Sequence, residues 1–542
     1  MTNLFSISIN DFLFLLIPVL FYAEIHFRIK GVPSLLYKKE PEIVFDLPYR
    51  SQVGEPVPLF LFVKDANRFP IRLEKIIIKI NGKQLRQSVV ITEDIHEEIN
   101  TNFLIKIVAL PPEHLLNPGL YSITAELRYR VGKKKKRITQ DNYRTISHTP
   151  FKLRVADNTL PFLPGWYWGD LHLHSNFTED QVEFGAPIEA SALCAKTLGL
   201  HFISFTDHSF DFEDNYFSDS FNENRWENFL DEISNHKLNP AEFIVIPGEE
   251  VSTGNHKNQN VHCLLIGNQI FYPGRGDGAK KLLKNTPTTR LTDLIQKVKS
   301  EDSTIIAAAH PLDVPPLSQR LILNRGFWHG EDLLQDGIDY WQILNGKLDK
   351  YFLEALILWK SALLSGRRIG IIAGNDAHGN FNCYRQINIP LLKIIKHHQQ
   401  LLGIMRTGVF IEGEWNEENL LSSLRRKRTV ISTGPLISLK IEQNGTQYYT
   451  GDDIRSNEPF NLTVEATSTK EFGNLEHIHL YHGTFEGKKE IHIPLRKEVF
   501  GFDFNDQLVF ENGLSTGYLR AEVFSSNNGR NQFCLTNPIW IQ

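Results

Sequence analysis

Histidine and carboxylate residues recur in short groups through the middle of this chain. The groups read DLHLHS, TDH, GEE, VH, AHP and GNDAHG, and they contain His172, His174, Asp207, His208, Glu249, Glu250, His262, His310, Asp376 and His378. Imidazole nitrogens and carboxylate oxygens without thiolates suit Zn²⁺, Mn²⁺ or Fe²⁺ rather than a structural cysteine-rich zinc site. The pattern therefore predicts a metal centre with hydrolytic chemistry.

Each group alone is weak evidence, because a single histidine in a strand is more often a hydrogen-bonded core residue than a ligand. The joint pattern is far less expected by chance, since the groups fall at or near the ends of separate apolar segments. Two metals about 3.5–4 Å apart can share a hydroxide whose pKa is lowered toward ~7, which gives a nucleophile at neutral pH. The same ions offset the charge that develops on a phosphate or a carbonyl group.

The segments that must position these groups alternate between short strands and helices. Strands are expected at 171–174, 202–206, 243–247, 261–266, 304–309, 338–344 and 369–373, and helices at 187–198, 226–236, 291–299 and 351–364. Such alternation implies parallel strands with crossover helices, in a barrel or an open sheet. In a barrel the active site forms at the carboxyl ends of the strands. We therefore expect the histidine and carboxylate groups to meet at that face.

Short alternating strands precede and follow this α/β block. Turn signals such as Asn81-Gly82 separate them in the first block, which is typical of an antiparallel sandwich. A proline-containing stretch, 159–165, leads into the α/β block, and short strands return after Gly434-Pro435. We predict four parts: an apolar segment over 1–40, a β-sandwich module over 41–158, a catalytic domain over 159–435 and a β module over 436–542.

The order DLHLHS, TDH, GEE, VH, AHP and GNDAHG resembles the PHP (polymerase and histidinol phosphatase) superfamily of metal-dependent phosphoesterases. The segments GEEVST, NVHCLLIG and GNDAHG resemble its CehA/McbA branch, and the resemblance covers the whole central block and reaches LRRKR and STGP in 424–435. The first block, by contrast, shows no such resemblance. The resemblance implies a distorted β/α barrel of about seven strands, here flanked by two β-sandwich-like modules. It also implies two or three divalent metals, Zn, Mn or Fe, at the carboxyl face of the strands.

The resemblance also implies a role for each residue. Carried onto this chain, the first metal would be bound by His172, His174 and Asp376 and the second by His262 and His310, with Glu250 bridging the two. A third metal would use His208 and His378 with an acid from the loop after HLHS. That loop reads Thr178-Glu179-Asp180 and departs from the common Ser-Asp-Gly, and we favour Asp180 over Glu179 as the ligand.

The predicted catalytic residues are Glu250, Asp207 and His208. Asp207 would steady the histidine-rich shell or hold a proton, and His208 or a metal-bound water would protonate the leaving group. Related sequences often have an acid where this chain has Gln342, and we draw no mechanism from that difference.

The predicted function is a metal-dependent phosphoesterase, in which a metal-bridging hydroxide attacks a small-molecule phosphate mono- or diester. One alternative keeps the same metal site but hydrolyses a carboxylic ester, an amide or a carbamate, because the CehA/McbA branch includes such a hydrolase. An alternative of another class is a glycan- or envelope-binding protein with a vestigial barrel. The intact set of ligands argues against it, because decay should have removed at least one.

Other charged candidates are weaker. The segment 274–280, GRGDGAK, resembles a phosphate-binding loop but lacks the Gly-Lys-Ser/Thr context, so we interpret it as a surface loop. Lys347 and Arg385 follow the last two strands and could clamp an anionic substrate, although each is more often a charge at the rim of a site.

Composition limits the partners. The net charge is −5, so no global basic field favours nucleic acid. The four cysteines, Cys194, Cys263, Cys383 and Cys534, lie far apart, which argues against a disulfide scaffold and a thiolate zinc site. A basic run at 133–137, KKKKR, falls at a predicted hairpin tip, where it is either solvated or in contact with anionic lipid or another polyanion.

The apolar run from Phe12 to Ala23 is shorter than the ~20 residues that a spanning helix needs. No basic residue precedes it and Arg28, Lys30, Lys38 and Lys39 follow it, which suits an anchor with its downstream side in the cytoplasm. A segment buried against the rest of the protein fits equally well, and a cleaved signal less so. The sequence therefore leaves a cytoplasmic and a membrane-associated location open.

Overall fold

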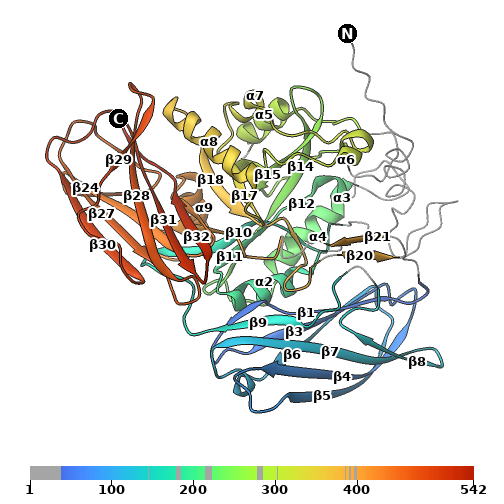
Figure 1. Cartoon of the computed structure of the whole chain (residues 1–542). Coiled ribbons are helices and arrows are strands. Elements are labelled where there is room, and N and C mark those ends of the chain that lie inside the picture. Colours follow the sequence, from blue (N-terminus) through green and yellow to red (C-terminus); the bar gives the residue numbers. More distant parts are fainter. Residues whose placement is uncertain are drawn as a thin grey trace, which may run out of the picture.

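The computed structural model describes residues 38–143, 146–178, 185–213, 223–277, 285–301, 303–384, 386–389, 392–395 and 400–542. Three regions follow one another along the chain (Figure 1): an N-terminal β sandwich, a central α/β region and a C-terminal β region. The apolar run from Phe12 to Ala23 lies outside the described residues. Among those described, no helix is both long and apolar enough to cross a bilayer.

The N-terminal sandwich is built from two sheets, with strand orders β1-β3-β6 and β2-β9-β7-β4-β5, and β8 pairs with β7. Its elements are β1 (Glu42–Asp46), β2 (Arg50–Gln52), β3 (Val57–Lys64), β4 (Ile71–Gly82), β5 (Val89–Ile99), β6 (Phe103–Leu110), the 3-10 helix η1 (Pro112–His114), β7 (Gly119–Val131), β8 (Lys134–Thr139) and β9 (Phe151–Ala156). Side chains alternate along β7, where Ile123, Ala125 and Leu127 are buried and the intervening residues face outward. This alternation fills the space between the two sheets.

Asp46 at the end of β1 connects the sandwich to the central region. Its carboxylate accepts hydrogen bonds from the backbone N–H groups of Phe381, Asn382 and Cys383. The ring of Phe60 in β3 also packs edge-on against Phe381, with 5.2 Å between centroids. The sandwich therefore lies directly against the loop that follows the GNDAHG motif.

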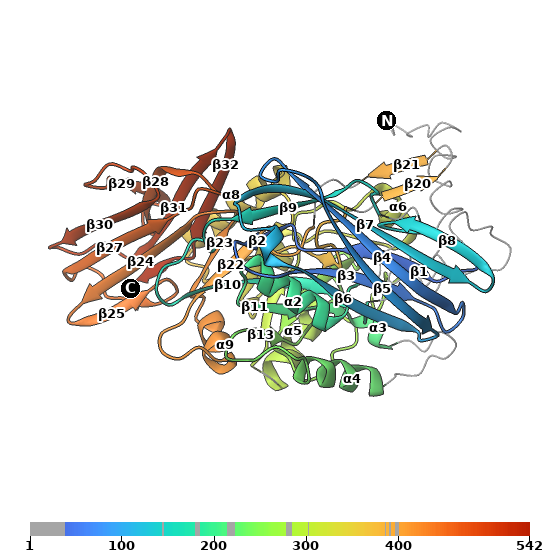
Figure 2. The same cartoon turned by 90° about the horizontal axis from the view of Figure 1, so that it is seen from below.

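The central region contains the metal-site motifs. Its strands are β10 (Trp166–His174), β11 (Phe202–Phe205), β12 (Asp207–His208), β13 (Ile244–Ile246), β14 (Gly248–Gly254), β15 (Asn260–Ile266), β16 (Ile305–Ala308), β17 (Tyr340–Asn345), β18 (Gly370–Gly374), β19 (Ala377–His378), β20 (Gln386–Ile389), β21 (Leu392–Ile395), β22 (Arg406–Phe410) and β23 (Thr429–Ser432). Its helices are α2 (Ile188–Leu198), α3 (Ser209–Glu213), α4 (Glu223–Ser234), α5 (Leu291–Glu301), α6 (Leu317–Ile322), α7 (Gly330–Leu333), α8 (Lys350–Leu364) and α9 (Glu417–Arg425). The helices lie around the strands, as expected for crossover connections (Figures 1 and 2).

The expected barrel is not present as one closed ring of hydrogen-bonded strands within the described residues. The central strands divide between two sheets, because β13-β11-β10-β22-β23 belong to one and β12-β14-β15-β16-β17-β18 to the other. Three strands change sheets along their length: β11 leads into β12, β13 into β14 across Pro247, and β18 into β19. The two sheets are thus connected through the chain.

Strand direction also differs from the expectation. β15 pairs antiparallel with both β14 and β16, whereas β16, β17 and β18 are parallel to one another. A short hairpin, rather than a crossover helix, joins β14 to β15. As a result, the amino end of β15 lies at the same edge as the carboxyl ends of the parallel strands.

The C-terminal region continues the first central sheet. β23 pairs with β32, so that strand order runs β10-β22-β23-β32-β31-β28-β29, and a second sheet, β25-β24-β27-β30, packs against it. The strands are β24 (Leu436–Gln443), β25 (Thr446–Tyr449), β26 (Asp453–Ile454), β27 (Phe460–Thr467), β28 (Asn474–Thr484), β29 (Lys489–Ile493), β30 (Asp503–Phe510), β31 (Gly517–Asn527), β32 (Arg530–Thr536) and β33 (Ile539–Ile541). Backbone hydrogen bonds therefore connect the central and C-terminal regions.

Candidate metal centre

The candidate site lies where β10 meets the edges of both central sheets. His172 and His174 are two residues apart in β10, so that their side chains share one face of the strand. Both are fully buried, with 0% of their surfaces exposed. β10 pairs with β19, and this pairing sets His174 beside His378 with 4.0 Å between ring centroids.

Glu250 in β14 is at the centre of the histidine cluster. Its Oε1 lies 2.5 Å from His262 Nδ1, 3.3 Å from His310 Nε2 and 3.6 Å from His172 Nε2. Its Oε2 lies 2.9 Å from His208 Nδ1 and 3.6 Å from His174 Nε2. A single buried carboxylate thus faces five histidines from four separate segments. This is the position expected of a bridging ligand.

Asp376 follows β18 and closes the cluster on the other side of β10. Its Oδ1 lies 3.0 Å from His174 Nε2 and 3.5 Å from His172 Nε2. Asp376 adopts a positive φ of 51° and His310 one of 29°, which non-glycine residues rarely do. Such backbone strain is concentrated at functional sites, where the surrounding structure holds it in place.

The spacing of these atoms fits a cation. Ligand atoms about 2.1 Å from a tetrahedral ion lie about 3.4 Å from each other. The distances that join His172 Nε2 and His174 Nε2 to Glu250 and Asp376 are 3.0–3.6 Å. Three sets of ligand atoms lie within 4.8 Å of one another: His172, His174, Glu250 and Asp376; His174, His208 and His378; His208, Glu250 and His262. The structure thus brings together all the predicted histidine, glutamate and Asp376 ligands.

Hydrogen bonds behind the cluster select which nitrogen of each ring faces it. His172 Nδ1 donates to Gln342 Oε1 at 2.8 Å, and His378 Nδ1 donates to the backbone oxygen of Asp376 at 3.1 Å. Because Nδ1 carries the proton, Nε2 presents a lone pair to the cluster. Gln342, for which the sequence suggested no role, therefore fixes the tautomer of His172.

The tautomer of His174 is fixed in the same way, by Thr178 and, behind it, Asp207. Its Nδ1 lies 3.2 Å from Thr178 Oγ1, whose own proton goes to Asp207 Oδ1 at 2.7 Å. Thr178 must then accept a hydrogen bond from His174 Nδ1, which leaves Nε2 free for a metal. Asp207 also accepts hydrogen bonds from the backbone N–H and the hydroxyl of Ser175, each at 2.8 Å. It acts through Thr178 and is thus placed as a positioning residue.

Asp277 contacts His262 of the cluster, and the sequence did not predict this contact. Its Oδ2 accepts from His262 Nε2 and from Arg325 Nη1, each at 2.8 Å, while its Oδ1 accepts from Ser252 Oγ at 2.5 Å. Arg325 Nη1 lies 2.9 Å from His262 Nε2, so the guanidinium and the ring share this carboxylate oxygen. The hydrogen bond from Nε2 turns Nδ1 of His262 toward Glu250. Asp277 belongs to the segment 274–280, which we had interpreted as a surface loop.

Two buried polar atoms at the centre lack hydrogen-bond partners. They are Nε2 of His172 and Oε2 of Glu250, whose 2.9 Å contact with His208 Nδ1 does not have hydrogen-bond geometry. A buried polar atom without a partner destabilises the fold by roughly 1–3 kcal/mol. Both atoms point into the cluster, where a cation would satisfy them. The residues present therefore fit divalent metal ions.

Electrostatics within the cluster follow the same arrangement. Burial alone would raise the pKa of Glu250, but His262 and His172 outweigh it and hold that pKa well below its usual range. Burial and then the neighbouring His378 and His208 lower the pKa of His174 well below its usual value. Burial also lowers the pKa of His172, but Glu250 and Asp376 more than offset this and raise it to about 9. A divalent cation would take the place of the proton held on His172.

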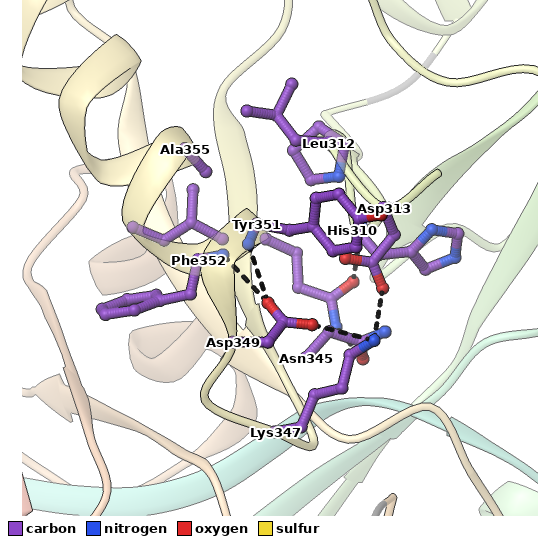
Figure 3. A pocket seen from close by; sticks show the side chains of 12 residues that line it. His310, Leu312, Asp313, Asn345, Lys347, Asp349, Tyr351, Phe352 and Ala355 are labelled. Atoms are coloured by element: carbon purple, nitrogen blue, oxygen red, sulfur yellow. Dashed lines mark hydrogen bonds and ion pairs between the residues drawn. The ribbon is translucent and has the colours of Figure 1, made fainter. Parts of the chain in front are cut away.

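Access to the cluster is from the side of His208 and His310. Their side chains are 11% and 16% exposed, whereas those of His172 and His174 are fully buried. A hollow of about 260 Å³, including its open mouth, adjoins His310 and Gln342 (Figure 3). Solvent and small molecules can therefore approach the centre past the side chains of His208 and His310.

Lys347 lies in this hollow and is not available as a simple anion clamp. Its ammonium group is 3.5 Å from Asp313 and 3.0 Å from Asp349, which also caps the amino end of α8 (Figure 3). Its charge is therefore largely compensated. Three other candidates, Glu179, Asp180 and Arg385, lie outside the described residues.

Comparisons with known proteins give limited information. No family model matches the chain, and no curated protein matches it. A two-domain protein from Bacteroides vulgatus, described as containing a predicted PHP-like metal-dependent phosphoesterase, is similar over 67% of this chain and 93% of its own, at 16% identity and a TM-score of 0.34. A β-glucuronidase from Bacteroides uniformis is similar over 92% of this chain and 60% of its own, at 13% identity and a TM-score of 0.18. At these TM-scores neither likeness carries an argument.

Proposed function

We propose that this protein is a metal-dependent hydrolase of the PHP superfamily, in its CehA/McbA-like branch, and that it hydrolyses phosphate mono- or diesters. The observation that carries the proposal is the orientation of the cluster. Hydrogen bonds from behind aim one nitrogen each of His172, His174 and His262 at Glu250 or Asp376. A structural histidine core has no need for such uniform orientation toward carboxylates.

The geometry around Glu250 supports two proposed metal sites. His172, His174 and Asp376 would hold the first metal, and His262 and His310 the second, with one oxygen of Glu250 toward each. A third site would use His208 and His378 beside His174. Asp180 would complete it, which remains a prediction from the motif. The metals would be Zn²⁺, Mn²⁺ or Fe²⁺.

When bound, the metals would supply Lewis acidity and an activated water for attack at phosphorus. The side chains of the protein would hold the metals, donate a proton and keep the ligands in position. Glu250 and Asp376 keep the metals in place with carboxylates that stay ionised at neutral pH, because neighbouring histidines lower both pKa values. His208, which is partly accessible, can give a proton to the leaving oxygen. Asp207 keeps Thr178 and His174 in position.

The hollow beside His310 would hold part of the substrate. It combines apolar side chains, Leu312 and Phe352, with the compensated Lys347 group and Asn345. Because Lys347 is paired with Asp313, the main attraction for a phosphate would come from the metals rather than from a basic side chain.

Elemental analysis of the purified full-length chain, combined with hydrolysis assays, tests the proposal. We expect at least two equivalents of divalent metal, and faster hydrolysis of an aryl phosphate mono- or diester than of the matching carboxylic ester. Asp376→Asn should abolish hydrolysis, whereas Asp336→Asn, at a site 96% exposed, should leave it unchanged. A metal-free active protein would refute the metal site. Faster carboxylic ester hydrolysis would refute only the phosphate assignment.

A further inference from the structure

The hairpin formed by β7 and β8 carries an uninterrupted basic run. The run is Lys133, Lys134, Lys135, Lys136 and Arg137, and all but Lys136 are exposed. A two-residue turn, Gly132-Lys133, joins the strands, and Gly132 has a φ of 58°, which suits a tight hairpin turn. The hairpin tip therefore presents its lysines to the surroundings.

Cross-strand pairing adds cations of β4 and β7 to the outer face that carries Lys135 and Arg137, while Lys134 and Lys136 alternate to the other face. The register sets Arg130 opposite Lys135 and Arg128 opposite Arg137. On the next strand, β4, Arg72 lies opposite Arg130 and Lys75 opposite Arg128. The two rows of three cations are Arg72, Arg130 and Lys135, and Lys75, Arg128 and Arg137. Like charges directly opposite each other are destabilising, so these rows need acidic partners.

Acidic side chains compensate both rows except Lys135. Arg72 pairs with Glu98, Lys75 with Asp94 and Arg130 with Glu74, while Glu126 pairs with both Arg128 and Arg137. Within the described part of the chain, no ion pair within 4 Å involves Lys133, Lys134 or Lys135. Net positive charge thus increases toward the hairpin tip.

The sheet is polarised from one edge to the other. Its strand order runs from β5 through β4 and β7 to β8. β5 contains the acids Glu93, Asp94, Glu97 and Glu98, whereas β8 contains Lys134, Lys135, Lys136 and Arg137. Since the whole chain carries −5, an anionic surface would attract the β8 edge and repel most of the molecule. Both views place β8 at the end of the sandwich away from the C-terminal region (Figures 1 and 2).

The chain enters the sandwich beside this basic edge. Glu40 accepts hydrogen bonds from Lys136 Nζ and from Tyr129 Oη, and Lys38 Nζ donates to the backbone oxygen of Asn142. Residue 38 is the first one described, and the apolar run 12–23 precedes it in the sequence. Residues 38–40 therefore lie beside β8.

We infer that the β7–β8 hairpin is a docking surface for a bilayer that contains anionic phospholipid. The charge complements an anionic headgroup layer, and each lysine or arginine near such a surface strengthens binding about fivefold. The apolar run 12–23 shortly precedes Lys38 in the sequence, and a basic patch together with an apolar segment is the two-signal combination that gives stable membrane association.

Sedimentation of the full-length protein with vesicles tests this surface. We compare neutral phosphatidylcholine vesicles with vesicles containing phosphatidylserine at about 0.1 M salt, and expect at least tenfold tighter binding to the anionic ones. The triple variant Lys133→Gln/Lys134→Gln/Lys135→Gln should lose this preference, as should the wild-type protein at about 0.5 M salt. The control Lys470→Gln/Lys488→Gln/Lys489→Gln removes the same charge from exposed sites in the C-terminal region and should keep it.

Hydrogen exchange gives a second readout that does not depend on how the N-terminus associates with lipid. Amides of residues 131–137 should exchange at least threefold more slowly on anionic than on neutral vesicles. Equal exchange on both, equal loss in the control triple variant, or tighter binding to a nucleic acid duplex than to anionic vesicles would each overturn the proposal.

Discussion

The chain contains two His-x-His motifs in strands, and they differ in everything except spacing. His172 and His174 in β10 are buried, oriented by hydrogen bonds from behind and faced by Glu250 and Asp376. His477 and His479 in β28 face the sheet surface, and His479 is near the rings of His492 and Tyr481, with centroids 5.6 and 6.1 Å away. Glu522, opposite His479, is engaged by Arg520. The spacing of two histidines therefore does not make a metal site. The pair in β10 differs because hydrogen-bond acceptors lie behind its two rings and carboxylates lie in front of them.

The largest difference should appear when each pair is removed. His172→Ala/His174→Ala should lower phosphatase activity by at least about 100-fold and remove at least one metal equivalent, because two ligands are lost. His477→Ala/His479→Ala should leave activity and metal content within about twofold of the wild type. Activity assays and elemental analysis measure both. Equal losses in the two double variants would contradict the comparison.

Removing the acceptor behind a ligand should have a smaller effect. Asp277→Asn cannot accept from His262 and Arg325 as a carboxylate does, so metal affinity should fall about 10–100-fold. Chelator competition measures the affinity independently of turnover. Asp332→Asn is the matched control, because Asp332 accepts from His256 in the same way but lies outside the cluster. Unchanged affinity in Asp277→Asn would show that His262 is not a ligand.

Thr178→Val should have a still smaller effect. Valine has the same shape but cannot accept from His174 Nδ1, and we expect metal affinity to fall by about tenfold or less. Thr197→Val removes a hydroxyl that bonds only within α2 and should change nothing. Isothermal titration of the metal into each protein distinguishes them. A larger loss for Thr178→Val than for Asp277→Asn would reverse the proposed order.

The smallest effect concerns a histidine that binds no metal. His201 accepts a hydrogen bond from the backbone N–H of Trp168, and burial lowers its pKa from 6.5 to about 4. The unfolded chain therefore binds more protons between pH 6.5 and 4, and this contribution to the free energy of unfolding falls as the pH falls through that range. At pH 6 the loss should be about 0.8 kcal/mol or less. Urea denaturation at pH 8 and pH 6 should show a smaller drop for His201→Asn than for the wild type.

The sequence predicted the parts of the site that depend on residue type in a strand. His172, His174, Glu250, His310 and Asp376 could be found because they lie in or directly after recognisable apolar segments. Asp277 could not, because its role depends on a loop that returns to β15, and loop conformations are not encoded by local periodicity. The hydrogen bond from His172 to Gln342 was likewise invisible, since it joins side chains 170 positions apart.

In the fold, too, local elements could be predicted from the sequence and long-range pairing could not. Helices α2, α5 and α8 lie within a residue or two of their expected ranges, because amphipathic segments and their ends are local features. The direction of β15 was wrong in the sequence interpretation, since VHCLLIG is equally apolar in either direction. The pairing of β23 with β32 also depends on contacts about 100 residues apart, as between Ile431 and Leu535. The boundary near residue 435 stays a prediction.

That pairing has a consequence for how the molecule holds together. β23 has β22 on one side and β32 on the other. A chain cut at residue 435 would leave the outer edge of β23 with unpaired backbone N–H and C=O groups, which is a template for aggregation. Tension applied to the C-terminus would likewise be transmitted through β32 and β23 to β22 and β10, the strand that carries His172 and His174. One continuous sheet therefore connects the C-terminal region mechanically to the strand of the candidate metal centre.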